Sequence, residues 1–185
     1  MRPRALGILL VSVGLAGLIG TGWAFAAGQG PGFRMWGSIG AGPTCNAPEL
    51  PGRTVEVTLS DMGGMMGGGR MGGGRMMNVA ASPSVVDAGE VSFRVWNAGM
   101  MVHELVVLPL PPGGAGTRPI GRDGRVSETG SLAEASRSCG QGTGDGIAPG
   151  AAGWVTLQLA PGRYELICNL PGHYAMGMFT ELDAR

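Results

Sequence analysis

Hydrophobic and polar residues alternate in a series of short stretches that begins at Thr54, and glycine- or proline-rich segments separate these stretches. Alternation with a period of two is typical of β-strands that bury one face. The stretches that show it are 54–59, 78–86, 91–97, 102–108, 154–159, 163–168 and 179–182. Pro83 interrupts the second stretch, which favours an edge strand, because proline cannot donate a hydrogen bond to a neighbouring strand.

One short helix is expected at residues 131–137, where Ser131 stands as N-cap and Glu134 at the capping-box position. Six or seven short strands, many turn residues and no long helix predict an all-β chain folded as an antiparallel β-sandwich.

The first 27 residues differ from the rest and have the pattern of an export segment. Arg2 and Arg4 form a short positive head, and residues 5–27 contain no charged side chain. Ala24 and Ala26 fit a small-x-small cleavage site, which predicts a signal peptide. An uncleaved apolar helix that anchors the chain in the membrane is the alternative, because residues 5–27 can span a bilayer. Both interpretations place the rest of the chain outside the cytoplasm, in the periplasm, at the cell surface or in the medium.

Three composition changes suggest how the chain is organised. Residues 28–53 are glycine-rich and read as a flexible tether, and residues 54–185 form the predicted domain. Inside that domain, residues 61–77 are a low-complexity run of Gly, Met and Arg, and residues 109–153 form a long insertion loop.

Only 14% of the residues are charged, and 13 basic side chains balance 13 acidic ones. With no basic cluster, nucleic acid is not an expected partner.

The tail of the chain gathers metal-binding side chains, because Cys168, His173, Met176 and Met178 lie within eleven residues. Soft sulfur together with imidazole suits copper in both of its oxidation states. His103 is the single other histidine, and its predicted strand and that of Cys168 can end at the same pole of a sandwich. The less specific alternatives are a small buried cysteine and an ordinary loop histidine, and zinc is the chemical competitor.

The remaining cysteines, Cys45 and Cys139, are expected to form a disulfide, because exported proteins meet an oxidising environment. Two free thiols are the alternative.

The tail resembles that of the cupredoxins, the small blue-copper proteins, and in particular the rusticyanin and auracyanin type. Four residues separate Cys168 from His173, four separate His173 from Met178, and Asn97 to Glu104 resembles the first-histidine region of that family. The resemblance covers about residues 54–183 and implies a Greek-key β-sandwich. It implies equatorial copper ligands at His103, Cys168 and His173 and an axial ligand at Met178, with Met176 as the alternative. Glu104 stands where many cupredoxins have Asn.

This resemblance implies an electron carrier with one type 1 copper per chain, cycling between Cu(II) and Cu(I), and not an enzyme with a small-molecule substrate. Two histidines are too few for an additional catalytic copper. Transient redox proteins are the expected partners, docking on a patch formed by Pro171, Tyr174, Met176, Met100 and Met101. The alternative is a copper-handling protein for storage, delivery or resistance, which would use thioethers as Cu(I) ligands. Those would come from Met62, Met65, Met66, Met71, Met76 and Met77.

Overall fold

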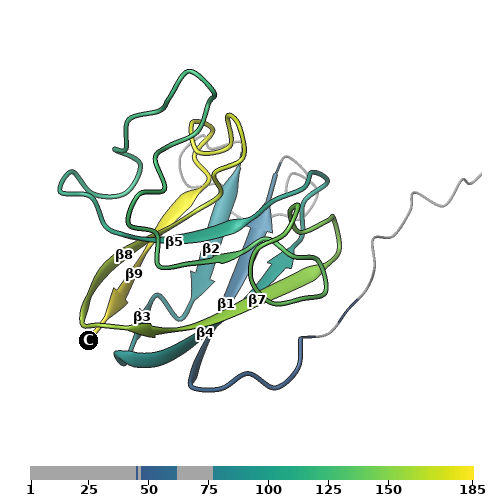
Figure 1. The fold of residues 1–185 in the computed structure, drawn as a ribbon, viewed down its shortest axis with the longest axis vertical. Coiled ribbons are helices and arrows are strands. Elements are labelled where there is room, and N and C mark those ends of the chain that lie inside the picture. The colour runs from purple at the N-terminus through teal and green to yellow at the C-terminus, as the bar shows by residue number, and fades with distance from the viewer. Residues whose placement is uncertain (1–44, 46, 62–76) are drawn as a thin grey trace, which may run out of the picture. The chain divides into compact units, whose positions relative to one another are not determined.

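The computed structural model describes residues 45, 47–61 and 77–185, and within them the strands form two packed sheets (Figure 1). One sheet has the order β2-β1-β4-β7 and the other has the order β3-β9-β8-β5-β6. The strands are β1 (Arg53–Ser60), β2 (Asn78–Ser82), β3 (Val85–Val86), β4 (Gly89–Asn97), β5 (Leu105–Pro109), β6 (Ala133–Ala135), β7 (Ala152–Leu159), β8 (Gly162–Ile167) and β9 (Phe179–Ala184). The predicted all-β two-sheet sandwich is confirmed.

The sheets are mixed, so the expectation of a purely antiparallel sandwich is wrong. β1 pairs with β4 in parallel, β3 pairs with β9 in parallel, and the other pairs are antiparallel. After β2 the chain crosses to the second sheet at β3, and β4 then returns to the first sheet. There β4 pairs with the edge of β1 that β2 leaves free, and it runs in the same direction as β1. The break between β2 and β3 falls at the cis peptide bond of Ser82–Pro83.

The main core lies between the two sheets and is built from the inward faces of alternating strands. Val55, Val57 and Leu59 of β1 are buried together with inward side chains of β4 and β8. Each large apolar side chain that is fully buried contributes about 1.5–3 kcal/mol. This core fixes the end of β8 that leads to Cys168, itself a member of the same cluster.

β5 and β8 are buried on both faces, which a simple alternating pattern does not predict. Val106, Leu108 and Ile167 form a second cluster with Val126 and Tyr174 on the outer side of their sheet. Val126 belongs to the long segment between β5 and β6, so part of the predicted insertion covers this outer face. Figure 1 shows that segment beside the loop between β8 and β9.

The helix expected at residues 131–137 is absent, and this prediction is wrong. The segment contains β6, which pairs antiparallel with the edge of β5. Leu132 N donates to Val107 O at 2.9 Å, and Ser136 N donates to Gly142 O at 3.0 Å. A helix of two turns is marginal alone, and pairing with the sheet edge satisfies more of the backbone. The Glu134 carboxylate accepts from the Ser136 hydroxyl instead of completing a capping box.

The disulfide predicted between Cys45 and Cys139 is confirmed, with an S–S distance of 2.16 Å. It ties the segment before β1 to the segment between β6 and β7. The export segment at 1–27, most of the tether at 28–53 and the Gly/Met run apart from Asp61 and Met77 lie outside the described residues. Among the described residues, no helix has the length and hydrophobicity needed to cross a membrane.

Candidate metal centre

His103 enters the site from the short connection between β4 and β5. Its backbone forms a two-way bridge with Ile147, in which His103 N donates to Ile147 O at 3.1 Å and Ile147 N donates to His103 O at 2.7 Å. Its side chain is fully buried. The residue therefore stands two positions before β5 instead of inside that strand, and the bridge holds its backbone from both sides.

Cys168 and His173 belong to one loop that leaves β8 and returns as β9. Cys168 is fully buried, on the same face as Tyr164 and Leu166, as the period of two predicted. Its N–H donates to Met178 O at 3.0 Å, and His173 N donates to Leu170 O at 3.0 Å. These bonds close the loop tightly, so the cysteine and the histidine face the same point.

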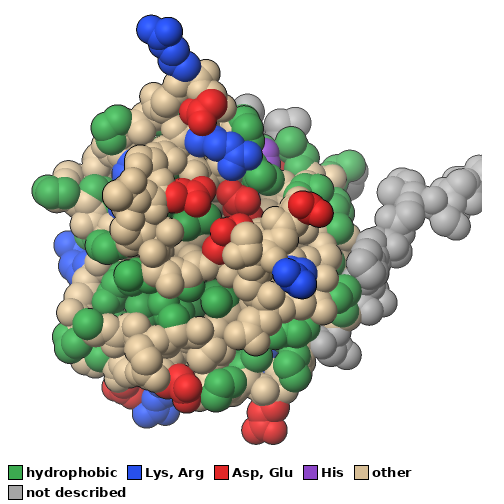
Figure 2. Space-filling model, in the orientation of Figure 1, with side chains coloured by type: hydrophobic (Ala, Val, Ile, Leu, Met, Phe, Trp, Pro, Cys, Tyr) green, Lys and Arg blue, Asp and Glu red, His purple; other side chains and the backbone are tan. Residues whose placement is uncertain are grey.

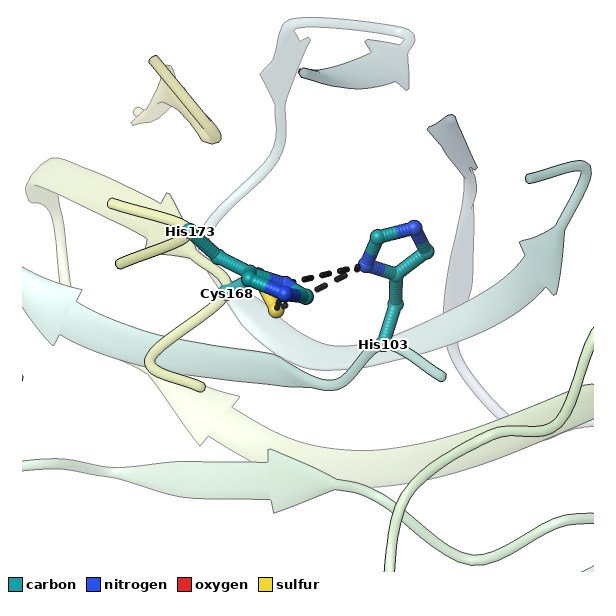
Figure 3. Close-up of side chains that lie close together, drawn as sticks. All are labelled: His103, Cys168 and His173. Carbon is teal, nitrogen blue, oxygen red and sulfur yellow. Dashed lines mark hydrogen bonds between the residues drawn. The ribbon is translucent and has the colours of Figure 1, made fainter. Parts of the chain in front are cut away.

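The three side chains converge although His103 is far from the other two in sequence (Figure 3). Nδ1 of His103 lies 3.2 Å from Nδ1 of His173. The sulfur of Cys168 lies 3.3 Å from Nδ1 of His173 and 3.9 Å from Nδ1 of His103. One donor atom from each residue thus faces a common centre, as the sequence predicted for these three residues.

Burial disfavours the charged forms of these three groups. It raises the pKa of the Cys168 thiol to about 12, an effect that hydrogen bonds from nearby backbone groups reduce in part. It lowers the pKa of His103, although Asp61 opposes the shift, and it lowers the pKa of His173, with the neighbouring His103 adding to the effect. Buried sulfur and imidazole donors that converge on one point are an environment that a metal ion can complete.

Met178 is fully buried, and its backbone N–H donates to His173 O at 3.2 Å. Met176 is half-buried and packs against the main core. Met178 is therefore tied by its backbone to both Cys168 and His173, which suits the axial role expected of it. Its role as a ligand stays a prediction.

Asp61 is a residue of the site that the sequence analysis missed. Its carboxylate lies 3.2 Å from Nε2 of His103, and it accepts from Met100 N and Met101 N, each at 2.8 Å. In the sequence, Asp61 stands at the start of the low-complexity run. The one signal available was an acidic residue directly after a well-predicted strand.

Glu104 and Asn169, the neighbours of two candidate ligands, also connect the two parts of the site. Glu104 N donates to the Cys168 sulfur at 3.4 Å, and Asn169 N donates to Oε1 of Glu104 at 3.1 Å. Burial, with a smaller contribution from the charge of Glu134, raises the pKa of Glu104 to about 7. Glu104 thus joins the connection that carries His103 to the loop that carries Cys168.

No family model and no curated protein matches the chain. Among solved structures, auracyanin B shares 21% identity at a TM-score of 0.46, over 75% of this chain and 93% of that one. Auracyanin A, a "blue" copper protein from Chloroflexus aurantiacus, shares 17% at a TM-score of 0.43, over 71% and 99%. Rusticyanin from Thiobacillus ferrooxidans shares 21% at a TM-score of 0.42, over 77% and 86%. The structural neighbours of this chain are thus auracyanins and rusticyanins, the type that its cysteine–histidine–methionine spacing resembles.

Proposed function

We propose that the chain is a cupredoxin that holds one type 1 copper and carries single electrons between redox proteins. The observation that carries the proposal is the convergence of the buried donors of His103, Cys168 and His173 within 4.8 Å of one another. Two imidazoles and one thiolate with a weak thioether form the ligand set of electron-transfer copper. His103, Cys168 and His173 would be the equatorial ligands and Met178 the axial one.

The donor atoms have the spacing that a single ion requires. Bonds from imidazole nitrogen and thiolate sulfur to a comparable ion, zinc, are about 2.0–2.3 Å long, so donors that share an ion lie about 3–4 Å apart. The measured separations of 3.2, 3.3 and 3.9 Å fall in this range. The cluster of three includes neither a second cysteine nor a carboxylate, which favours copper over structural zinc. Bound copper supplies a reversible Cu(II)/Cu(I) couple.

His173 is the natural exit for the electron, because it is the more exposed imidazole. His103 is fully buried, whereas 5% of His173 is exposed. Figure 2 shows a small edge of a histidine side chain at the surface beside hydrophobic side chains. A redox partner that docks here would come close to a ligand.

Four of the five residues expected to form the docking patch are at least partly exposed. Met100 and Met101 are exposed, Pro171 is exposed and Met176 is half-buried. Tyr174 is only 2% exposed, so the prediction that it belongs to the patch is wrong; its hydroxyl turns inward to Glu165. We propose that the four remaining residues receive transient redox partners through a modest apolar contact.

We also propose that the protein works outside the cytoplasm and is not an enzyme. The disulfide between Cys45 and Cys139 supports the compartment, because such bonds persist in oxidising environments. Four protein ligands would leave no coordination position for a substrate.

The test is the optical and electron spin resonance spectrum of the purified protein with one equivalent of Cu(II). We expect an intense visible band from thiolate-to-copper charge transfer, which bleaches on reduction and returns on oxidation. The matched control is Cys168→Ser, which keeps the side-chain size and removes the thiolate. A colourless Cu(II) complex of the unaltered protein would refute the proposal.

Copper stoichiometry separates the carrier from the alternative, a copper-handling protein. Met77, one of the six methionines of the Gly/Met run, is 4% exposed and packs in the main core, which makes it a poor surface ligand. The other five lie outside the described residues. Titration with Cu(I) should give one ion per chain for a carrier, whereas several ions that disappear on deletion of residues 63–75 would favour handling.

A further inference from the structure

Asp61 stands where β1 ends, directly beside the connection that carries His103. β1 and β4 run in parallel with Leu59 opposite Asn97, and Ala98 N donates to Leu59 O at 2.8 Å. This register brings the residues after each strand together, although they are far apart in sequence. Asp61 is 8% exposed, so the charge of its carboxylate acts on its neighbours with little screening by water.

Backbone groups of the connection between β4 and β5 bind the Asp61 carboxylate, and the carboxylate in turn stabilises that connection. Met100 N and Met101 N donate to it, and the fully buried Asn97 shapes the turn by donating to Met101 O and Ile147 O, each at 2.7 Å. Oδ2 of Asp61 also lies 3.2 Å from Nε2 of His103. These hydrogen bonds from the backbone orient the carboxylate toward Nε2 of His103.

The two nitrogens of His103 therefore face different groups. Figure 3 shows one ring nitrogen toward Cys168 and His173 and the other turned away from them. Nε2 meets the acceptor Asp61 and Nδ1 meets the other donors of the metal cluster. A neutral imidazole carries one proton, and the hydrogen bond at one nitrogen decides which nitrogen keeps a free lone pair.

Gly99 provides the space for this contact. A Cβ placed on Gly99 would lie 2.7 Å from Oδ2 of Asp61 and 2.9 Å from Nε2 of His103. Any larger residue would push the carboxylate and the imidazole apart. The contact thus depends on three residues: the acid, the histidine and the glycine beside both.

We propose that Asp61 is the positioning residue of His103: its carboxylate accepts a hydrogen bond from Nε2–H and so leaves the lone pair of Nδ1 free to bind the metal. The copper part of this inference rests on the function proposed above. Carboxylates that accept from a ligand histidine fix its tautomer and strengthen its bond to the metal. The negative charge also favours the more highly charged Cu(II), so the loss of Asp61 weakens Cu(II) binding more than Cu(I) binding.

The test uses Asp61→Asn and Asp61→Ala, with Glu90→Gln as the control. Glu90 is exposed at the opposite end of β4, so its replacement removes the same charge far from the site. In the metal-free protein, nitrogen NMR should show His103 with the proton on Nε2, and this tautomer should lose its dominance in both Asp61 variants. Cu(II) affinity should fall about 10–100-fold in these variants and stay unchanged in Glu90→Gln.

Gly99→Ala is the second variant and covers the case in which the Asp61 variants do not fold. It keeps the carboxylate but forces it away from the imidazole, so the same change in tautomer and affinity is expected. A tautomer and a Cu(II) affinity that stay unchanged in these variants would overturn the proposal. The NMR measurement needs no metal, so it decides the role of Asp61 even if the unaltered protein fails to bind copper through Cys168.

Discussion

Two methionines follow His173, and their burial separates their expected roles. Met178 is fully buried with its backbone bonded to His173 and Cys168, whereas Met176 is half-buried at the edge of the core. We expect Met178→Leu to raise the reduction potential and shift the visible spectrum, because loss of a thioether donor destabilises Cu(II) more than Cu(I). The replacement conserves volume and should cost less than about 1.5 kcal/mol in stability.

Met176→Leu is the matched control and should leave both the potential and the spectrum unchanged. Voltammetry and absorption of the two copper-bound variants make the comparison. If Met176→Leu produced the shift and Met178→Leu did not, the axial assignment would pass to Met176.

At the scale of single residues, the sequence predicted that His103, Cys168 and His173 lie close together, but it did not predict the residues that support them. Cys168 and His173 are neighbours on one loop, so their spacing alone brings them together. Asp61 reaches His103 only because β1 and β4 pair in parallel with a particular register. Residue types alone carry no information about that register, so a residue such as Asp61 could not be assigned to the site.

At the scale of elements, the segment between β5 and β6 is anchored beside the ligand loop. Glu165 of β8 is fully buried and accepts from Arg118 Nε at 2.5 Å, from Gly116 N at 2.8 Å and from the Tyr174 hydroxyl at 2.9 Å. Tyr174 directly follows His173, so this network connects the covering segment to a candidate ligand. Buried charges of this kind are stabilising only while each partner is present.

We expect Tyr174→Phe to lower the free energy of unfolding by about 1–3 kcal/mol, because Arg118 N and Glu165 each lose a buried partner. It should also accelerate the loss of copper, since the His173 loop loses its anchor. Chemical denaturation and the rate of copper transfer to a chelator measure the two effects.

Tyr164→Phe provides a matched control at the other end of β8, where the Tyr164 hydroxyl donates to Ala160 O at 2.7 Å. This variant should lose stability without a faster loss of copper. Equal copper-loss rates in the two variants would show that Tyr174 supports only the fold.

We expect the disulfide between Cys45 and Cys139 to stabilise the fold without altering the candidate metal site. It closes a separation of 94 residues, and long loops of this kind contribute about 2–5 kcal/mol through the unfolded chain. Replacing both cysteines with alanine should lower the unfolding free energy by that amount and leave the spectrum of bound copper unchanged. An altered copper spectrum would mean that the bridge shapes the metal centre.

Element predictions succeeded where local pattern and tertiary environment agreed. The stretch at 54–59 alternates and buries one face, as β1 does. Residues 131–137 carry local helix signals, yet the edge of β5 offers backbone partners that a two-turn helix lacks. The burial of β5 on both faces could not be predicted from its own sequence either, because it depends on a covering segment from another part of the chain.

At the scale of the whole molecule, composition and alternation were sufficient for a two-layer sandwich but not for its mixed topology. Strand direction depends on where the chain crosses between sheets, and that crossing takes place at the two-residue strand β3. The alternation of hydrophobic and polar residues within each strand does not show where the chain crosses from one sheet to the other. The parallel pair β1–β4 that results is also what brings Asp61 to His103.

Because the candidate ligands come from distant parts of the fold, a bound ion should stabilise the whole domain. His103 belongs to the connection before β5, and Cys168 and His173 to the loop between β8 and β9. Unfolding separates these segments, so copper binds the folded state in preference, and free copper at 100 times Kd contributes about 2.7 kcal/mol. Removal of copper should therefore lower Tm while the sandwich remains folded, because most members of the two hydrophobic clusters are not candidate ligands.

Calorimetry under anaerobic conditions, with and without Cu(I), measures this difference. In Cys168→Ser the site keeps its shape but loses the thiolate, so the increase in Tm on addition of copper should largely disappear. The same increase in both proteins would place the stabilising copper elsewhere in the chain, because stabilisation that does not need the thiolate cannot come from an ion bound to Cys168.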